Sequence, residues 1–285
     1  MSVWFSAGYA ISAAAGEVTA GMASRMSNFT TVLLLASPAA LLVAVVAALV
    51  RPGNVSVAGI VWGTVAGIVG GAALPVAYRA LARGPIGVVA SVIACTSTVA
   101  LGVAGIVTDG PPPLVVWAGM ALSVIAIVLF AERPRKASKA ETADPTSELR
   151  SAVSMAIIAG LGFAGFTFLM SIAQRDDNGP WSLVAARTAV LAVAVSLPFI
   201  TGPVTRPTWK VSATSLSAGV LDVTGNLLLL AALATTPLIT VAIIGATSPG
   251  IAALGAALLL RERLNRYQIL GLILAAGGAA LAAGA

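Results

Sequence analysis

Three ionisable side chains lie within long apolar stretches of this sequence: Glu17, Arg187 and Asp222. A charged side chain costs about 2.5–3.5 kcal/mol at the centre of a membrane helix on insertion scales, so each of the three needs a specific role. Each is a candidate for binding a proton or a charged substrate. A structural ion pair is the alternative, and Arg187 is also near enough to the start of its stretch to extend its charge to a membrane surface.

Asn226 follows Asp222 by one helical turn and is expected to share its face. The two side chains are candidates for lining a polar cavity, where they would contact a substrate or a proton. Hydrogen bonds to neighbouring helices are the alternative role for the same pair.

Two apolar stretches are interrupted by polar residues near their middles. Thr247, Ser248 and Pro249 interrupt the stretch 237–260, and Thr96 and Ser97 occupy the corresponding place in 86–107. A proline inside a helix frees backbone groups that must be satisfied by protein or cavity water. Paired interruptions in corresponding spans point to a binding site, so these five residues are candidates for lining a cavity. A kink with a structural role is the other interpretation.

The residue types that are missing exclude several kinds of chemistry. The chain has no histidine and a single cysteine, Cys95. Most transition-metal sites, histidine-based nucleophilic catalysis and an intrachain disulfide are therefore excluded, and we expect neither an enzyme nor a cofactor. The net charge of +6 comes from Lys and Arg in short segments between apolar stretches, which favours a role in membrane topology over nucleic-acid binding.

The elements that carry these residues are expected to be membrane-spanning helices. The composition is 59% hydrophobic and 9% charged, whereas soluble domains carry about 25% charged residues. Continuous apolar runs of about 20 residues match helices that cross a bilayer, and the first is expected to be retained rather than cleaved as a signal peptide. We predict an all-α membrane protein with ten spans, at roughly 3–23, 29–50, 55–78, 86–107, 113–131, 152–173, 181–200, 211–234, 237–260 and 265–284.

The sequence repeats itself after about 152 residues, a period typical of half-protein duplications in transporters. This shift places Gly67 on Gly219 and Pro85 on Pro237 without a gap. We predict a first repeat at 1–131, a charged linker at 132–150 and a second repeat at 151–285. Because each repeat has five spans, an odd number, the second repeat should enter the membrane the opposite way up, which gives two inverted five-helix repeats.

The distribution of basic residues predicts the orientation. Lys and Arg accumulate on one side of the ten predicted spans, and only Arg51 and Arg175 fall on the other. The positive-inside bias places the crowded side in the cytoplasm. We therefore predict a cell-membrane protein with the linker 132–150 inside and both termini outside.

The end of the second half carries Glu262, Leu264, Gln268 and Gly271, followed by a glycine-rich last span. This spacing resembles the pattern G-E-x-L-x-x-x-Q-x-x-G of the EamA-type, ten-helix branch of the drug/metabolite transporter superfamily. The resemblance covers nearly the whole chain, and the second half carries its clearest motif. The first half departs from the pattern, with Asp109 and Gly110 where a Glu is usual. Members are usually drawn with both termini in the cytoplasm, which conflicts with the orientation that the charges predict here.

The first span resembles the small multidrug resistance branch of the same superfamily. The similar residues are Glu17, Val18, Arg25, Ser27, Phe29 and Thr30, with one residue missing before Phe29. In that branch the membrane-embedded Glu binds protons and a cationic substrate in exchange, and the resemblance implies this role for Glu17.

Together these features predict a secondary transporter in the lipid bilayer, with a cavity at the membrane midplane that opens alternately to each side. The resemblance implies export of a small organic metabolite, amino-acid-like or drug-like. Proton coupling would run through Glu17 or Asp222, because a proton and a substrate can compete for one carboxylate. We expect Asp222→Asn to abolish transport in a folded protein. The alternatives are an uncoupled or inward-directed carrier of the same fold, and a membrane enzyme or lipid-handling protein.

Overall fold

The computed structural model describes residues 2–51, 53, 55–83, 86–131, 145–174, 179–202, 204, 206–260 and 266–284. Within these ranges the chain is helical and contains no strand, as predicted. The helices are α1 (Ser2–Met26), α2 (Phe29–Val50), α3 (Val57–Arg83), α4 (Ile86–Asp109), α5 (Leu114–Ala131), α6 (Pro145–Ala173), α7 (Trp181–Ser196), α8 (Pro198–Thr201), α9 (Trp209–Leu233), α10 (Leu238–Gly245), α11 (Ser248–Leu260) and α12 (Arg266–Ala283).

All ten predicted spans are helical in the structure. Six of them are long and apolar enough to cross a membrane, namely those of α2, α3, α4, α6 and α9 and the span that α7 and α8 form together. The helices α5 and α12 are shorter, and α10 and α11 divide the ninth span. The helix α1 is long, with 25 residues, and carries Glu17 in its interior.

Two spans are broken where the sequence carries proline. The helix α10 ends at Gly245 and α11 begins at Ser248, so the predicted interruption of the ninth span is confirmed. Here the Thr247 hydroxyl donates to Ile244 O at 2.7 Å. In the seventh span α7 ends at Ser196, and Pro198 starts the short helix α8.

The predicted linker is shorter than the sequence suggested. The helix α6 begins at Pro145, so the last six residues of 132–150 belong to its first turns. Proline is favourable at the start of a helix because its missing N–H would have no intrahelical partner there. Residues 132–144 lie outside the described part of the chain.

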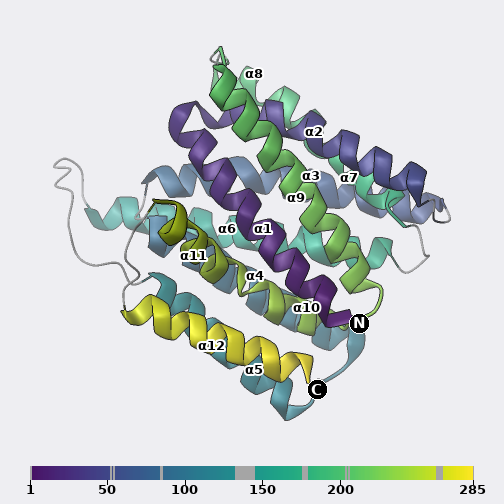
Figure 1. The fold of residues 1–285 in the computed structure, drawn as a ribbon, viewed down its shortest axis with the longest axis vertical. Coiled ribbons are helices and arrows are strands. Elements are labelled where there is room, and N and C mark those ends of the chain that lie inside the picture. Colours follow the sequence, from purple (N-terminus) through teal and green to yellow (C-terminus); the bar gives the residue numbers. More distant parts are fainter. Residues whose placement is uncertain are drawn as a thin grey trace.

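The helix pairs correspond between the two halves of the chain. The helix α1 packs along α9, and α3 packs along α6; α2 packs on α9, and α3 packs on α7. In the two halves α1 corresponds to α6, α2 to α7 and α3 to α9. The contact α1–α9 therefore corresponds to α6–α3, and the contact α2–α9 corresponds to α7–α3. The helices α5 and α12, which end the two halves, lie side by side (Figure 1). The most extensive contacts between helices thus join one half to the other.

Small side chains allow this packing. The largest buried cluster combines alanines of α2, α3 and α7 with a few large residues from α6, α7 and α9: Ala40, Ala44, Ala66, Met170, Leu183, Ala186, Val223 and Leu230. Between membrane helices close backbone approach and van der Waals contact supply the association energy, which favours alanine and glycine at such contacts. This tight packing positions α7 and α9, which carry Arg187 and Asp222, and α1, which carries Glu17, packs along α9.

Candidate functional site

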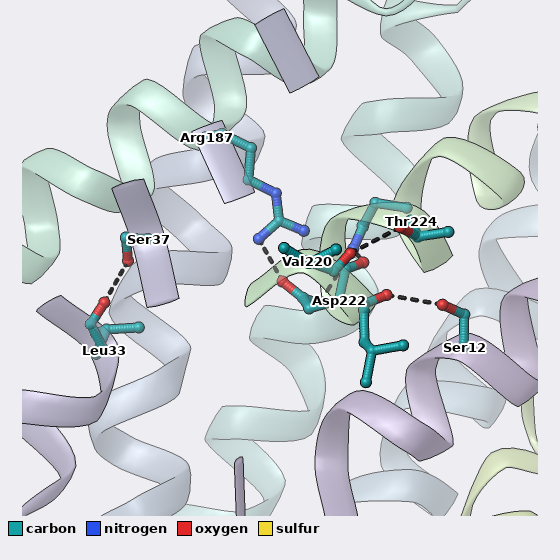
Figure 2. Close-up of polar contacts among 9 residues, drawn as sticks. Ser12, Leu33, Ser37, Arg187, Val220, Asp222 and Thr224 are labelled. Atoms are coloured by element: carbon teal, nitrogen blue, oxygen red, sulfur yellow. Dashed lines mark hydrogen bonds and ion pairs between the residues drawn. The ribbon is translucent and has the colours of Figure 1, made fainter. Parts of the chain in front are cut away.

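The structure joins two of the three membrane-embedded charges. Arg187 Nη1 in α7 lies 2.5 Å from Asp222 Oδ2 in α9, and Figure 2 shows the guanidinium extending from α7 to the carboxylate. The Arg187 side chain is 9% exposed and that of Asp222 is 52% exposed. Arg187 therefore does not extend to a membrane surface; of the interpretations left open by the sequence, the ion pair is the one observed.

Asn226 contacts Asp222 from one turn further along α9, so the expected shared face is confirmed. Its Nδ2 donates to Asp222 O at 2.8 Å and lies 3.2 Å from Asp222 Oδ1. The amide is buried, so this contact also satisfies a polar group in the helix interior. One oxygen of Asp222 thus faces Arg187 and the other faces Asn226.

The helix α1 approaches α9 closely at the same level. Ser12 Oγ donates to Leu221 O at 2.8 Å (Figure 2). A Cβ placed on Gly16 would lie 3.3 Å from the backbone nitrogen of Asp222, so glycine permits this approach. Glu17 follows Gly16 directly, so the third charge lies one residue from this contact between α1 and α9.

Glu17 differs from Asp222 in its partners. Its side chain is exposed, and Ser248 Oγ of α11 donates to Glu17 Oε1 at 3.4 Å, a long hydrogen bond. Among the side chains that the structure describes, Arg187–Asp222 is the only ion pair. In that part of the chain Glu17 is therefore a carboxylate without a cationic partner.

Two tyrosines that the sequence analysis did not select lie near the carboxylates. Tyr9 of α1 and Tyr78 of α3 are both within electrostatic range of Glu17 and Asp222. Tyr78 also stacks on Phe29, with ring centroids 3.8 Å apart. Tyr9 lies two turns before Glu17 in the same helix, so the sequence could have suggested its place near the carboxylate. The sequence could not have suggested the place of Tyr78, because α3 is brought to the site by tertiary packing.

The polar interruptions do not all join this site. Ser248 contacts Glu17. The Thr247 hydroxyl instead donates a hydrogen bond to the nearby Ile244 O, and Pro249 lies in the first turn of α11. Ser97 Oγ of α4 lies 2.8 Å from Gly160 O of α6, and a Cβ on Gly160 would lie 2.8 Å from Thr96 Cβ. Thr96 and Ser97 thus belong to the contact between α4 and α6.

The residues that were compared with the EamA-type pattern lie in separate parts of the chain. Asp109 Oδ2 accepts a hydrogen bond from Leu238 N at 2.9 Å, which ties the end of α4 to the start of α10. Gly271 is buried in α12, whereas residues 261–265, which include Glu262 and Leu264, lie outside the described part of the chain.

A groove on the surface of the described residues lies away from these charges. An open groove of about 660 Å³ runs between α3 and α7, and Ile60, Thr64, Ile68, Trp181, Val184 and Thr188 are among its lining residues. Its lining is mostly apolar and does not include Arg187, which points from α7 toward α9. An apolar, open groove of this kind suits lipid chains. The candidate site is therefore the charged cluster, by which we mean Glu17, Arg187 and Asp222.

Comparisons with known proteins agree with this architecture. Residues 150–284 match the model of the EamA-like transporter family. A solved structure titled "Crystal structure of protein" superposes with a TM-score of 0.77 at 14% sequence identity, covering 97% of this chain and 96% of that one. At this identity the likeness shows a shared fold over nearly the whole chain. The comparison with curated proteins found no match.

Proposed function

We propose that this chain, which belongs to the EamA-like transporter family, exports a small organic metabolite by proton-coupled alternating access. The family consists in general of drug and metabolite transporters, and the apolar helices place the chain in a membrane with several spans. The substrate is a small molecule of the amino-acid-like or drug-like kind. Proton coupling is proposed from the charged side chains described above, and export is proposed from the family resemblance.

The observation that carries this proposal is the difference between the two carboxylates. Asp222 is held by Arg187 and Asn226, whereas Glu17 has only the distant Ser248 hydroxyl among the described side chains. An exposed carboxylate at membrane depth faces water or a bound cation rather than lipid. Glu17 is therefore the group that would take up a proton from one side and release it when substrate binds.

Alternating access is supported by the way in which the halves pack. The pairs α1–α9 and α3–α6 correspond to each other, as do α2–α9 and α3–α7. Two bundles that interlock in this way can rock between two equivalent arrangements, one opening the cavity inward and one outward. We propose that the two five-helix halves, 1–131 and 151–285, are inverted repeats that move in this manner.

The test compares metabolite export from cells that express the unmodified protein, Glu17→Gln or Asp222→Asn. The matched control is Asp109→Asn, which makes the same chemical change outside the charged cluster. We expect one or more compounds to accumulate in the medium with the unmodified protein and the control, but not with the other two variants. The identified compound is then tested in proteoliposomes with an imposed pH gradient.

Three results would contradict parts of the proposal. Unchanged export by Asp222→Asn and Glu17→Gln would remove the charged cluster from the mechanism. Flux that ignores the pH gradient would favour an uncoupled carrier. Depletion of a compound from the medium, instead of accumulation, would reverse the direction.

A further inference from the structure

The helices α3 and α7 touch through glycine, and the groove described above follows their contact. Gly63 and Gly67 of α3 face the backbones of Ser182 and Ala186 of α7 so closely that a Cβ on either glycine would overlap with them. This order of contacts shows that the two helices run in the same direction. Small residues let two membrane helices approach closely. The groove of about 660 Å³ therefore has one wall from each half of the chain.

The lining of the groove is suited to hydrocarbon. Its larger side chains are mostly apolar and include Ile60, Ile68 and Val184. Two lining hydroxyls already donate within their own helices, Thr64 to Ile60 O and Thr188 to Val184 O, each at 2.8 Å. A hydrocarbon chain can therefore fill the groove without leaving these donors unpaired.

The groove lies at bilayer depth. The helix α3 and the span formed by α7 and α8 are both long and apolar enough to cross a membrane. The lining residues of α7 extend from Trp181 to Ser196, which is about 22 Å of helix at 1.5 Å per residue. One leaflet of the bilayer contributes about 15 Å of hydrocarbon. A groove of this length can take an acyl chain from one leaflet along its full extent.

One end of the groove carries groups that suit a lipid headgroup. Trp181 lines the groove at the start of α7, and tryptophan is enriched at the membrane interface. The segment that joins α2 to α3 lies against this end, because a Cβ on Gly179 would lie 3.8 Å from Arg51 O. Arg51 is exposed and forms no ion pair with any described side chain. Its guanidinium can therefore pair with a phosphate, a geometry that arginine favours.

We propose that the groove between α3 and α7 binds one phospholipid, with an acyl chain along the lining residues and the phosphate paired with Arg51. The site is separate from the charged cluster, since Arg187 extends from α7 toward Asp222 of α9 (Figure 2). The proposal does not depend on the transport function. A chain in this position contacts one helix from each half, so the bound lipid stabilises the contact between them.

The repeat does not duplicate the groove. The shift of about 152 residues places Leu216 at the position of Thr64, and Leu33 at the position of Ala185. Leucine is larger than either of the residues that line the groove. The equivalent contact between α2 and α9 therefore leaves less room for a chain, and we expect one specific lipid per protein molecule.

The test titrates the full-length protein in detergent with two lipids that have the same oleoyl chains, and native mass spectrometry counts the bound molecules. Dioleoylphosphatidylcholine has a phosphate, whereas dioleoylglycerol has none. We expect the first phosphatidylcholine to bind more tightly than any further molecule. Dioleoylglycerol should bind about tenfold more weakly, because it lacks the charge-assisted hydrogen bond to the guanidinium.

Two variants fill the groove and a third removes the partner of the phosphate. Ala185→Leu introduces the side chain found at the equivalent position, and Thr188→Leu fills the same space from an exposed position if the first variant does not fold. Each should weaken the binding of both lipids about tenfold. Arg51→Gln should weaken only phosphatidylcholine, to the level of dioleoylglycerol. The matched controls are Ala121→Leu on an exposed position of α5 and Arg206→Gln between α8 and α9, and neither should change binding.

Three outcomes would overturn the inference. Lipid binding that is unchanged in Ala185→Leu and Thr188→Leu would show that lipids only surround the protein without a specific site. An equal loss in Ala121→Leu would show the same. An unchanged affinity of Arg51→Gln for phosphatidylcholine would contradict the pairing with phosphate. None of these outcomes bears on export, which is measured separately as accumulation of a compound in the medium.

Discussion

Gly67 and Gly219 occupy equivalent positions in the two halves, and each lies against the backbone of a helix from the other half. Gly67 in α3 faces the backbone of Ala186 in α7, and Gly219 in α9 faces the backbone of Ala36 in α2. At both positions a Cβ would overlap with carbonyl and Cα atoms of the facing helix. Glycine is therefore required twice for the same reason, at the two contacts that interlock the halves.

Replacing either glycine by alanine should destabilise the protein. The facing atoms belong to backbone and cannot rotate away, so we expect Gly67→Ala and Gly219→Ala each to cost about 1–3 kcal/mol of unfolding free energy. Gly277→Ala is the matched control, because no atom lies within 4 Å of its added Cβ and alanine is the better helix former. Thermal unfolding in detergent measures all three. Equal stability of Gly67→Ala and Gly277→Ala would show that α3 and α7 do not approach as described.

The sequence analysis located the helices well because their determinants are local. Apolar runs and the proline at position 249 gave the ten spans and the break between α10 and α11. The exception is the start of α6, where residues 145–150, with Glu148 and Arg150, were assigned to a linker. These mostly polar residues form helical turns before the apolar run begins, and a prediction based on apolarity cannot include them.

The site was only partly predictable because its contacts are tertiary. The cost of charge in a membrane singled out Glu17, Arg187 and Asp222 individually. That Arg187 pairs with Asp222 depends on how α7 and α9 both pack on α2, and this could not be read from spacing. Tyr78 reaches the site only because of the way α3 is placed by tertiary packing. Thr96 and Ser97 matched Ser248 and Pro249 in register but lie against α6 instead.

Breaking the Arg187–Asp222 pair should have unequal effects on stability. Asp222→Asn leaves a guanidinium that is 9% exposed without a counter-charge, whereas Arg187→Gln leaves a carboxylate that is 52% exposed and still contacts Asn226. We expect a loss of about 1–3 kcal/mol for the first change and below about 1 kcal/mol for the second. A double-mutant cycle followed by thermal unfolding measures this. A larger loss for Arg187→Gln would contradict the burial difference between the partners.

The predicted orientation is tested with two matched valines. Val55 lies between α2 and α3 and is 64% exposed, and Val204 lies between α8 and α9 and is 41% exposed. In a Cys95→Ser background, Val55→Cys should react with a membrane-impermeant maleimide on intact cells, because our topology places it outside. Val204→Cys should react only after the cells are permeabilised. The reverse pattern would place both termini in the cytoplasm.

Asp109 should stabilise the start of α10 through a hydrogen bond made from another helix. Pro237 occupies the N-cap position of α10 and has no side chain that can accept from the first N–H groups, whereas Asp109 Oδ2 accepts from Leu238 N at 2.9 Å. Losing a capping acceptor costs about 0.5–2 kcal/mol, so Asp109→Ala should lower the unfolding free energy by this amount and speed amide exchange at 238–241. Asp109→Asn keeps an acceptor oxygen and should stay close to the unmodified protein. If both variants lose the same stability, the negative charge near the helix N-terminus, rather than the hydrogen bond, is what stabilises α10.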